Sequence, residues 1–144
     1  MRDIPTSSPS NPQSNRPIAP RLRSAREVVE AYNLIAWNQC DLDLADELLG
    51  DRIIRHGVGS VTVLTHDEAV ARIKDHHAMF ESIRFDVRTI VAGVDGEHAA
   101  IMYDATIVLD DGTVSAIGSM EIFRVVDGRI TEVWNTGHQE GSWA

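Results

Sequence analysis

The chain has a single cysteine, Cys40, and all five of its prolines lie within the first 20 residues. One cysteine excludes an intramolecular disulfide and any cysteine-based metal cluster, which fits a reducing compartment. No apolar run approaches the roughly 20 residues of a membrane-spanning helix. The N-terminus also lacks the apolar block of a signal peptide, which is about 7–15 residues long. We therefore expect a cytoplasmic protein with no membrane partner.

Motifs for metal and cofactor binding are also missing. The sequence has no His-x-x-x-His pair and no His-Glu-x-x-His motif, and the adjacent His76 and His77 point in different directions on a helix. It has no glycine-rich phosphate loop, serine-centred elbow or dinucleotide fingerprint. We expect no metal and no cofactor.

Positive charge is scarce outside the N-terminus. The net charge is −9, and residues 1–26, with five arginines and one aspartate, carry +4, which leaves −13 for the remainder. An acidic body repels a phosphate backbone, so we expect no nucleic-acid partner.

The 144 residues divide into an arm and one domain. Residues 1–23 are rich in proline, serine and asparagine, a composition that cannot bury enough apolar surface to offset its ordering entropy. We interpret this segment as a flexible arm and residues 24–144 as the folded domain.

Capping boxes and glycines mark the expected elements. Ser24 with Glu27, and Thr65 with Glu68, predict two helix starts, and Gly50 is expected to cap the end of a helix. The expected order is a helix from residue 24, a helix over 42–49, a strand over 52–56, a helix over 65–82, a strand over 84–94 and three more strands within 101–135. Helices followed by an antiparallel meander predict an α+β fold, in which a curved antiparallel sheet forms a cone-shaped barrel closed by the N-terminal helices.

Polar residues interrupt the three apolar strands of residues 101–135. A two-residue loop at Asp111-Gly112 would place Asp104 opposite Ser119. A three-residue loop over 126–128, with Gly128 in the left-handed position of a bulge, would place Ser119 opposite Asn135. Because side chains alternate with period two, this register puts four polar residues on one face of the sheet: Asp104, Ser119, Glu121 and Asn135.

The same register predicts an apolar convex face. It would carry Ile101, Tyr103, Ile107, Met120, Ile122 and Trp134. That is too much apolar surface to leave in water on a monomer, so we expect a homodimer through this face.

Two segments of the sequence resemble a known family. VVEAYNLIAWNQCDLDLADELLGDRIIRHG and SMEIFRVVDGRITEVWN are similar to the SnoaL-like branch of the nuclear transport factor 2-like superfamily. The resemblance extends from Ala25 to Trp134. It is specific for the fold and weak for the reaction, because the superfamily includes cyclases, isomerases, hydrolases, dehydratases and binding proteins on one scaffold.

The resemblance implies different roles in three enzyme families. Asn135 stands where SnoaL-like polyketide cyclases have an acid/base aspartate, and Glu121 stands where they have a pocket histidine. In limonene epoxide hydrolases, Asp104 matches one carboxylate of the catalytic pair, whereas Asn135 replaces the second and Met102 replaces the arginine between them. In ketosteroid isomerases, the positions of the general base, the oxyanion-hole acid and the oxyanion-hole tyrosine fall at His56, Glu121 and Tyr32.

Together these observations predict an apolar pocket that contains two carboxyl groups. A neutral acid beside an ionised base suffices to move a proton next to a carbonyl group. Candidate catalytic residues are Asp104, Glu121, His56, Asn135 and Tyr32, and candidate substrate-binding residues are Met102, Ser119, Phe123, Phe80, His77 and Val133. The expected partner is a small hydrophobic organic molecule.

The leading hypothesis is a cofactor-independent isomerase or cyclase of a carbonyl compound, with Asp104 as general base. An epoxide hydrolase or hydratase/dehydratase using the same pocket is the first alternative. A non-catalytic protein that binds a hydrophobic ligand is the second. The sequence leaves these three open.

Overall fold

The computed structural model describes residues 21–144, which form three α-helices, one π-helical segment and seven strands. Most of the predicted N-terminal arm, residues 1–20, lies outside the described residues. Its last part is placed against the domain by ion pairs from Arg21 to Glu27 (2.9 Å) and from Arg23 to Glu47 (3.0 Å). The elements are α1 (Ala25–Ala31), the π-helical segment η2 (Tyr32–Trp37), α2 (Leu42–Leu48), β1 (Leu49–Gly57), β2 (Ser60–Thr65), α3 (His66–Met79), β3 (Ser82–Ala92), β4 (His98–Val108), β5 (Val114–Val126), β6 (Arg129–Asn135) and β7 (Gln139–Glu140).

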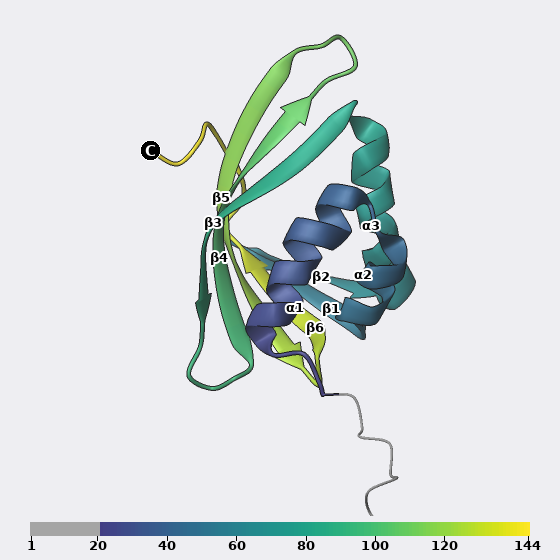
Figure 1. The fold of residues 1–144 in the computed structure, drawn as a ribbon, viewed down its shortest axis with the longest axis vertical. Helices are drawn as coiled ribbons and strands as arrows, with labels where there is room; N and C mark the ends of the chain where they lie inside the picture. Colours follow the sequence, from purple (N-terminus) through teal and green to yellow (C-terminus); the bar gives the residue numbers. More distant parts are fainter. Residues whose placement is uncertain (1–20) are drawn as a thin grey trace, which may run out of the picture.

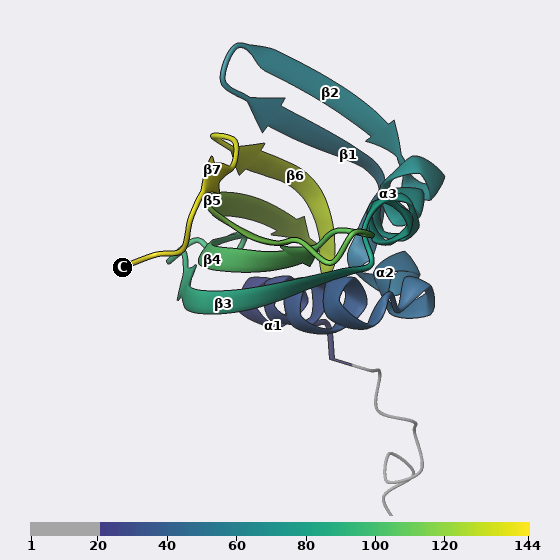
Figure 2. The ribbon, with the colours of Figure 1, turned by 90° about the horizontal axis from the view of Figure 1, so that it is seen from above.

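One curved sheet organises the molecule, with strand order β2-β1-β6-β5-β4-β3 and the short β7 paired with β5. The helices cover one face of the sheet, and the other face is bare except for the C-terminal tail (Figure 1). Seen from above, the sheet bends around the helix-covered side (Figure 2). The α+β fold with a curved sheet is therefore confirmed.

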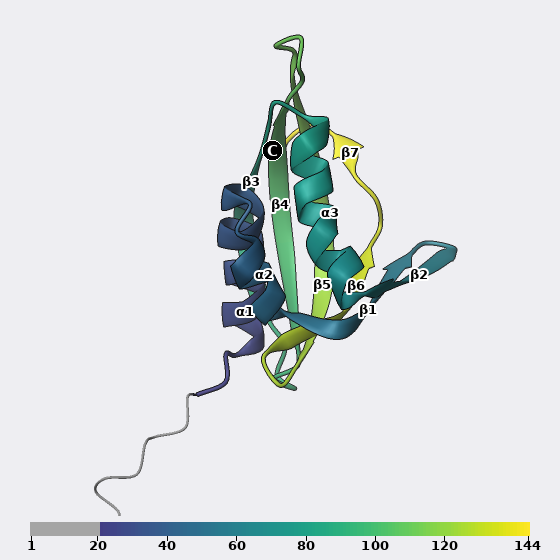
Figure 3. The same ribbon diagram turned by 90° about the vertical axis from the view of Figure 1, so that its right-hand side faces the viewer.

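Two features of the sheet differ from expectation. β1 pairs with β6 in parallel, whereas all other neighbouring strands are antiparallel. β2 was not predicted. It forms a hairpin with β1 that projects from one side of the sheet (Figure 3), and it leaves Val61 and Val63 exposed.

The helix starts follow the predicted capping boxes. Ser24 accepts a hydrogen bond from the Glu27 backbone N–H, and the Glu27 carboxylate accepts one from the Ser24 N–H. Thr65 and Glu68 make the same reciprocal pair before α3. These bonds satisfy backbone donors that the first turn of a helix leaves free.

Gly50 does not cap a helix. It lies inside β1, next to β6, and a Cβ atom at this position would be 3.0 Å from the Ile130 carbonyl oxygen. Glycine suits this position because the two backbones approach closely and a side chain would crowd the Ile130 carbonyl.

The two predicted loops have exchanged lengths. Leu109 and Thr113 close a three-residue loop in which Gly112 has φ +85°, and the turn at Asp127-Gly128 has two residues, both with positive φ. The first change shifts β4 by one residue against β5, so Ser119 is opposite Tyr103 and Asp104 is opposite Gly118. A one-residue shift turns every side chain to the other face.

The β5–β6 register is corrected by a bulge. The shorter turn is followed by a register shift between Arg124 and Val125, after which Glu121 faces Asn135. Glu121 and Asn135 therefore share a face as predicted, although Asn135 lies opposite Glu121 and not opposite Ser119.

The predicted convex face is half wrong for the same reason. Ile101, Tyr103 and Ile107 point toward the helices and are buried in the core or at its edge. Met120 and Ile122 do lie on the bare face, with 49% and 46% of their surface exposed.

Candidate active site

A pocket of about 240 Å³ lies between the concave face of the sheet and the helices. Its walls come from η2, α3, β1, β3, β4, β5 and the residues that follow β6. Most of the lining is aromatic or aliphatic, including Trp37, Phe80 and Phe85. The polar groups are few, which is typical of a small-molecule site.

The π-helical segment supplies one wall. Its wider turn brings Tyr32, Asn33 and Trp37 to the same side, and all three are buried and line the pocket. The Tyr32 and Trp37 rings meet edge to face with centroids 6.4 Å apart. Asn33 donates from Nδ2 to the Val29 carbonyl oxygen (2.8 Å) and so fixes the turn from inside.

Glu121 is the one carboxylate among the described residues that line this pocket. Its Oε1 accepts two hydrogen bonds, from the Tyr103 hydroxyl (3.1 Å) and from Asn135 Nδ2 (2.6 Å). Ser119 Oγ in turn lies 3.3 Å from Asn135 Oδ1 and orients the amide. The Glu121 Oε2 accepts no hydrogen bond from residues 21–144, so this oxygen is available to a ligand.

The C-terminal tail brings a histidine to the same cluster. His138, between β6 and β7, places Nε2 3.0 Å from the Tyr103 hydroxyl oxygen. Because the hydroxyl donates its one proton to Glu121, it accepts from His138 Nε2–H. The chain of hydrogen bonds therefore runs from His138 through Tyr103 to Glu121.

Both pocket tyrosines are held in the neutral form. Burial raises the pKa of Tyr32. Burial also raises the pKa of Tyr103, and the neighbouring Glu121 carboxylate adds to this shift because it repels a phenolate. Each hydroxyl therefore acts as a hydrogen-bond donor at neutral pH.

Two arginines complete the polar part of the pocket. Arg55 comes from β1 and Arg72 from α3. Burial lowers the pKa of Arg72, and the charge of Arg55 lowers it further.

Several predicted residues meet as expected. Tyr32, Glu121 and Phe80 line the pocket, and Asn135 and Ser119 stand behind Glu121. Phe123 and Val133 were predicted to contact the substrate, but they do not line the pocket: they belong to the core, with 0% and 2% of their surface exposed.

Asp104 is not in the pocket, which contradicts its predicted position. It points to the bare face, where Oδ2 accepts from Arg88 Nε (2.8 Å) and Oδ1 accepts from the Trp143 backbone N–H (2.9 Å). The tail covers it, so it is buried. The Trp143 hydrogen bond, supported by Arg88, holds the pKa of Asp104 below its usual value.

His56 and Met102 also lie on the bare face, contrary to prediction. His56 stacks on Trp134 with ring centroids 4.9 Å apart, and its Nε2 is 2.8 Å from Glu132 Oε2. Arg55, the residue before His56 on β1, points inward and lines the concave pocket, so it occupies the place expected for His56.

His77 is a structural residue. Its Nε2 lies 2.5 Å from the Trp37 carbonyl oxygen, and its ring stacks on Trp37. The neighbouring His76 lines the pocket instead.

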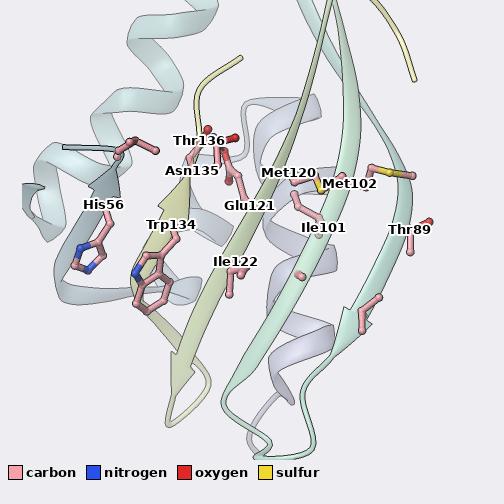
Figure 4. A pocket seen from close by; sticks show the side chains of 14 residues that line it. His56, Thr89, Ile101, Met102, Met120, Glu121, Ile122, Trp134, Asn135 and Thr136 are labelled. Carbon is pink, nitrogen blue, oxygen red and sulfur yellow. Dashed lines mark hydrogen bonds between the residues drawn. The ribbon is translucent and has the colours of Figure 1, made fainter. Parts of the chain in front are cut away.

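The bare face has a hollow of its own, of about 530 Å³. Figure 4 shows the His56 and Trp134 rings side by side, with Ile122 on the next strand and Met120 and Met102 farther across the sheet. The lining is mostly apolar, and Glu121 and Asn135 border this hollow as well as the hydrogen-bonded cluster of the concave side. The hollow lacks Tyr32, Tyr103 and the two arginines that line the concave pocket.

The sequence model of the SnoaL-like domain matches residues 28–133, most of the chain. The chain belongs to the SnoaL-like family. No curated protein sequence matches it.

Solved structures similar to this SnoaL-like chain share its fold at low identity. An LEH-like epoxide hydrolase from M. tuberculosis is 21% identical with a TM-score of 0.65, over 78% of this chain and 80% of that chain. A SnoaL-like polyketide cyclase from Agrobacterium tumefaciens is 13% identical with a TM-score of 0.68, over 82% and 93%. A protein with a ketosteroid isomerase-like fold from Catenulispora acidiphila, in complex with trimethylamine, is 16% identical with a TM-score of 0.64, over 79% and 87%.

The sequence reasoning missed Arg55, Arg72 and Tyr103 as pocket residues. Arg55 comes directly before His56, and Tyr103 comes directly before Asp104. The error was therefore in which face of each strand points into the pocket. Arg72 precedes the buried Ile73 on α3, and the sequence alone does not distinguish a half-buried arginine there from an exposed one.

Within residues 21–144, no group of three or more histidine, cysteine, aspartate or glutamate side chains is placed to hold a metal ion. In the same part of the chain, no helix is long and apolar enough to cross a membrane.

Proposed function

We propose that this SnoaL-like protein is a cofactor-independent enzyme that moves a proton next to the carbonyl group of a small organic molecule, as an isomerase or cyclase. The observation that carries the proposal is the state of Glu121. Two donors hold Oε1, whereas Oε2 accepts no hydrogen bond from the described residues, and Glu121 lines the mostly apolar concave pocket.

In the proposed reaction, Glu121 Oε2 takes a proton from the carbon next to the substrate carbonyl. The electron pair of the broken C–H bond moves toward the carbonyl oxygen, and the neutral Tyr32 hydroxyl donates a hydrogen bond to the enolate that forms. Return of the proton to another carbon gives an isomer. Alternatively, the enolate carbon attacks a second carbonyl of the same molecule, which closes a ring and turns that carbonyl into an alkoxide, and Glu121 returns its proton to the alkoxide.

The position of Asp104 argues against the epoxide hydrolase alternative. That reaction, as implied by the family resemblance, uses two carboxylates in one pocket. Here Asp104 binds Arg88 on the opposite face, and Asn135 is an amide. Glu121 is left without a second acid among the described residues of the pocket.

The experiment compares Glu121→Gln with Glu132→Gln, the same change on the bare face. Each protein is incubated in D₂O with a β,γ-unsaturated steroid ketone, a linear polyketone ester and a terpenoid ketone, and deuterium uptake is followed by mass spectrometry. We expect the wild type to accelerate exchange on at least one compound and Glu121→Gln to reduce this rate about 10²–10⁴-fold. Glu132→Gln should stay within about twofold.

A wild-type protein that binds one of these compounds in a thermal-shift assay, yet never exchanges its protons between pH 5 and 9, would be a binding protein. Equal loss in both variants would remove Glu121 from the proposed role.

A further inference from the structure

Arg55 and Arg72 stand out among the arginines of this acidic chain. Within residues 21–144, neither forms an ion pair or a side-chain hydrogen bond. Other arginines do find carboxylates: Arg21 binds Glu27, Arg23 binds Glu47, Arg88 binds Asp104, and Arg124 binds Glu97 and Glu132. Arg52 and Arg84 also lack an ion pair, but both are exposed to water. Among residues 21–144, Arg55 and Arg72 are the half-buried arginines without a carboxylate partner, and both line the concave pocket.

Two half-buried guanidinium groups in one pocket are unfavourable without an anion. They repel each other, and each loses part of its hydration. The carboxylate of Glu121 lies in the same pocket but is not within ion-pair distance of either, since its hydrogen bonds go to Tyr103 and Asn135. The described residues therefore leave an excess of one positive charge among the two arginines and Glu121.

We propose that Arg55 and Arg72 bind a carboxylate carried by the substrate, so that the enzyme acts on small aromatic or alicyclic carboxylic acids. The planar guanidinium group matches a carboxylate with two parallel hydrogen bonds. The apolar walls, with Trp37, Phe85 and Ile117, hold the ring or chain beside it. A volume of about 240 Å³ limits the ligand to a small molecule.

This inference names the substrate class of the proposed function and rests on it only for the reaction, because the anion site is testable by binding alone. The probe is benzoate, and its neutral isostere benzamide is the control ligand. Binding is measured by isothermal titration calorimetry at low salt, with the wild type and with Arg55→Gln and Arg72→Gln. Arg52→Gln, an exposed arginine three residues before Arg55 on β1, is the matched control.

We expect benzoate to bind the wild type at least tenfold more tightly than benzamide does, and added NaCl to weaken only the benzoate complex. Arg55→Gln and Arg72→Gln should each weaken benzoate at least tenfold, and Arg52→Gln should leave it unchanged. If a glutamine variant does not fold, Arg72→Lys replaces it, because lysine keeps the charge and loses the bidentate geometry. It should show a smaller loss.

Equal affinities for benzoate and benzamide, or wild-type affinity in both glutamine variants, would overturn the anion site. Glu121→Gln separates the two proposals, since it should reduce proton exchange about 10²–10⁴-fold while keeping or strengthening benzoate binding. A protein that exchanges protons through Glu121 but does not bind benzoate would retain the proposed function and lose this inference.

Discussion

The Tyr103 hydroxyl and Glu121 Oε1 lie 3.1 Å apart and join β4 to β5 on the concave side of the sheet. The next residue along β4, Asp104, is turned to the other side and holds the C-terminal tail. Two consecutive residues therefore act on opposite faces of the sheet: Tyr103 lines the pocket, and Asp104 holds the C-terminal tail.

Tyr103→Phe tests the pocket side. It removes one of the two donors to Glu121 Oε1 and breaks the link to His138. We expect an exchange rate about tenfold lower, because the carboxylate is then held by Asn135 alone. The free energy of unfolding should fall by less than about 1.5 kcal/mol, measured by urea titration, because the ring stays in place. A wild-type exchange rate would show that the hydroxyl has no part in the reaction.

Asp104→Asn tests the opposite face. Because the folded-state pKa of Asp104 is lowered, its stabilising effect is present above its unfolded-state pKa of about 3.9 and is lost as the pH falls through the lower folded-state value. We expect the variant to melt about 5 °C below the wild type at pH 7 and much closer to it at pH 3.

The measurement is thermal unfolding by circular dichroism across this pH range, with Asp110→Asn, an exposed loop residue, as control. Proton exchange should persist in Asp104→Asn, since the carboxylate does not enter the pocket. A loss of exchange as large as that of Glu121→Gln, in a folded protein, would return Asp104 to the reaction.

The sequence allowed the fold to be predicted from local signals. The capping boxes at Ser24 and Thr65 and the Asp-Gly turns are chemical features that act within a few residues, and each is found where expected. The face of β4 depended instead on whether the loop before β5 has two residues or three. Both loops contain Asp-Gly, and both lengths accommodate a glycine with positive φ.

A single residue of loop length therefore decided whether Asp104 or Tyr103 faced the pocket. The same problem affected β1, where β2 and the parallel pairing with β6 were not predicted, so that His56 was assigned the place of Arg55. Glu121 and Asn135 share a face as predicted because β6 has one extra residue in a bulge. This extra residue offsets the one residue that the second turn lacks relative to the prediction. Which residues line the pocket therefore depended on pairings between distant strands, and these pairings cannot be predicted from local sequence patterns.

The homodimer through the bare face stays a prediction, now with fewer residues. Met120 and Ile122 are about half exposed there, beside the apolar hollow. We expect light scattering to give twice the chain mass for the wild type and the chain mass for Ile122→Asp, because a buried carboxylate is costly in an apolar interface. Val114→Asp, exposed at the far end of β5, should remain dimeric. A wild type that is monomeric at micromolar concentration would contradict the predicted interface.

Arg72→Gln should make the ligand-free protein more stable. In the absence of an anion, Arg72 is half-buried near Arg55, and both burial and the charge of Arg55 disfavour its charged form. The neutral glutamine removes the repulsion between the two guanidinium groups, and we expect the melting temperature to rise by about 3 °C at low salt. The gain should shrink at high salt, where the repulsion is screened. With saturating benzoate the order should reverse, because only the wild type gains the binding energy of the anion. A residue kept for structure alone would give the opposite result, a lower melting temperature with and without benzoate.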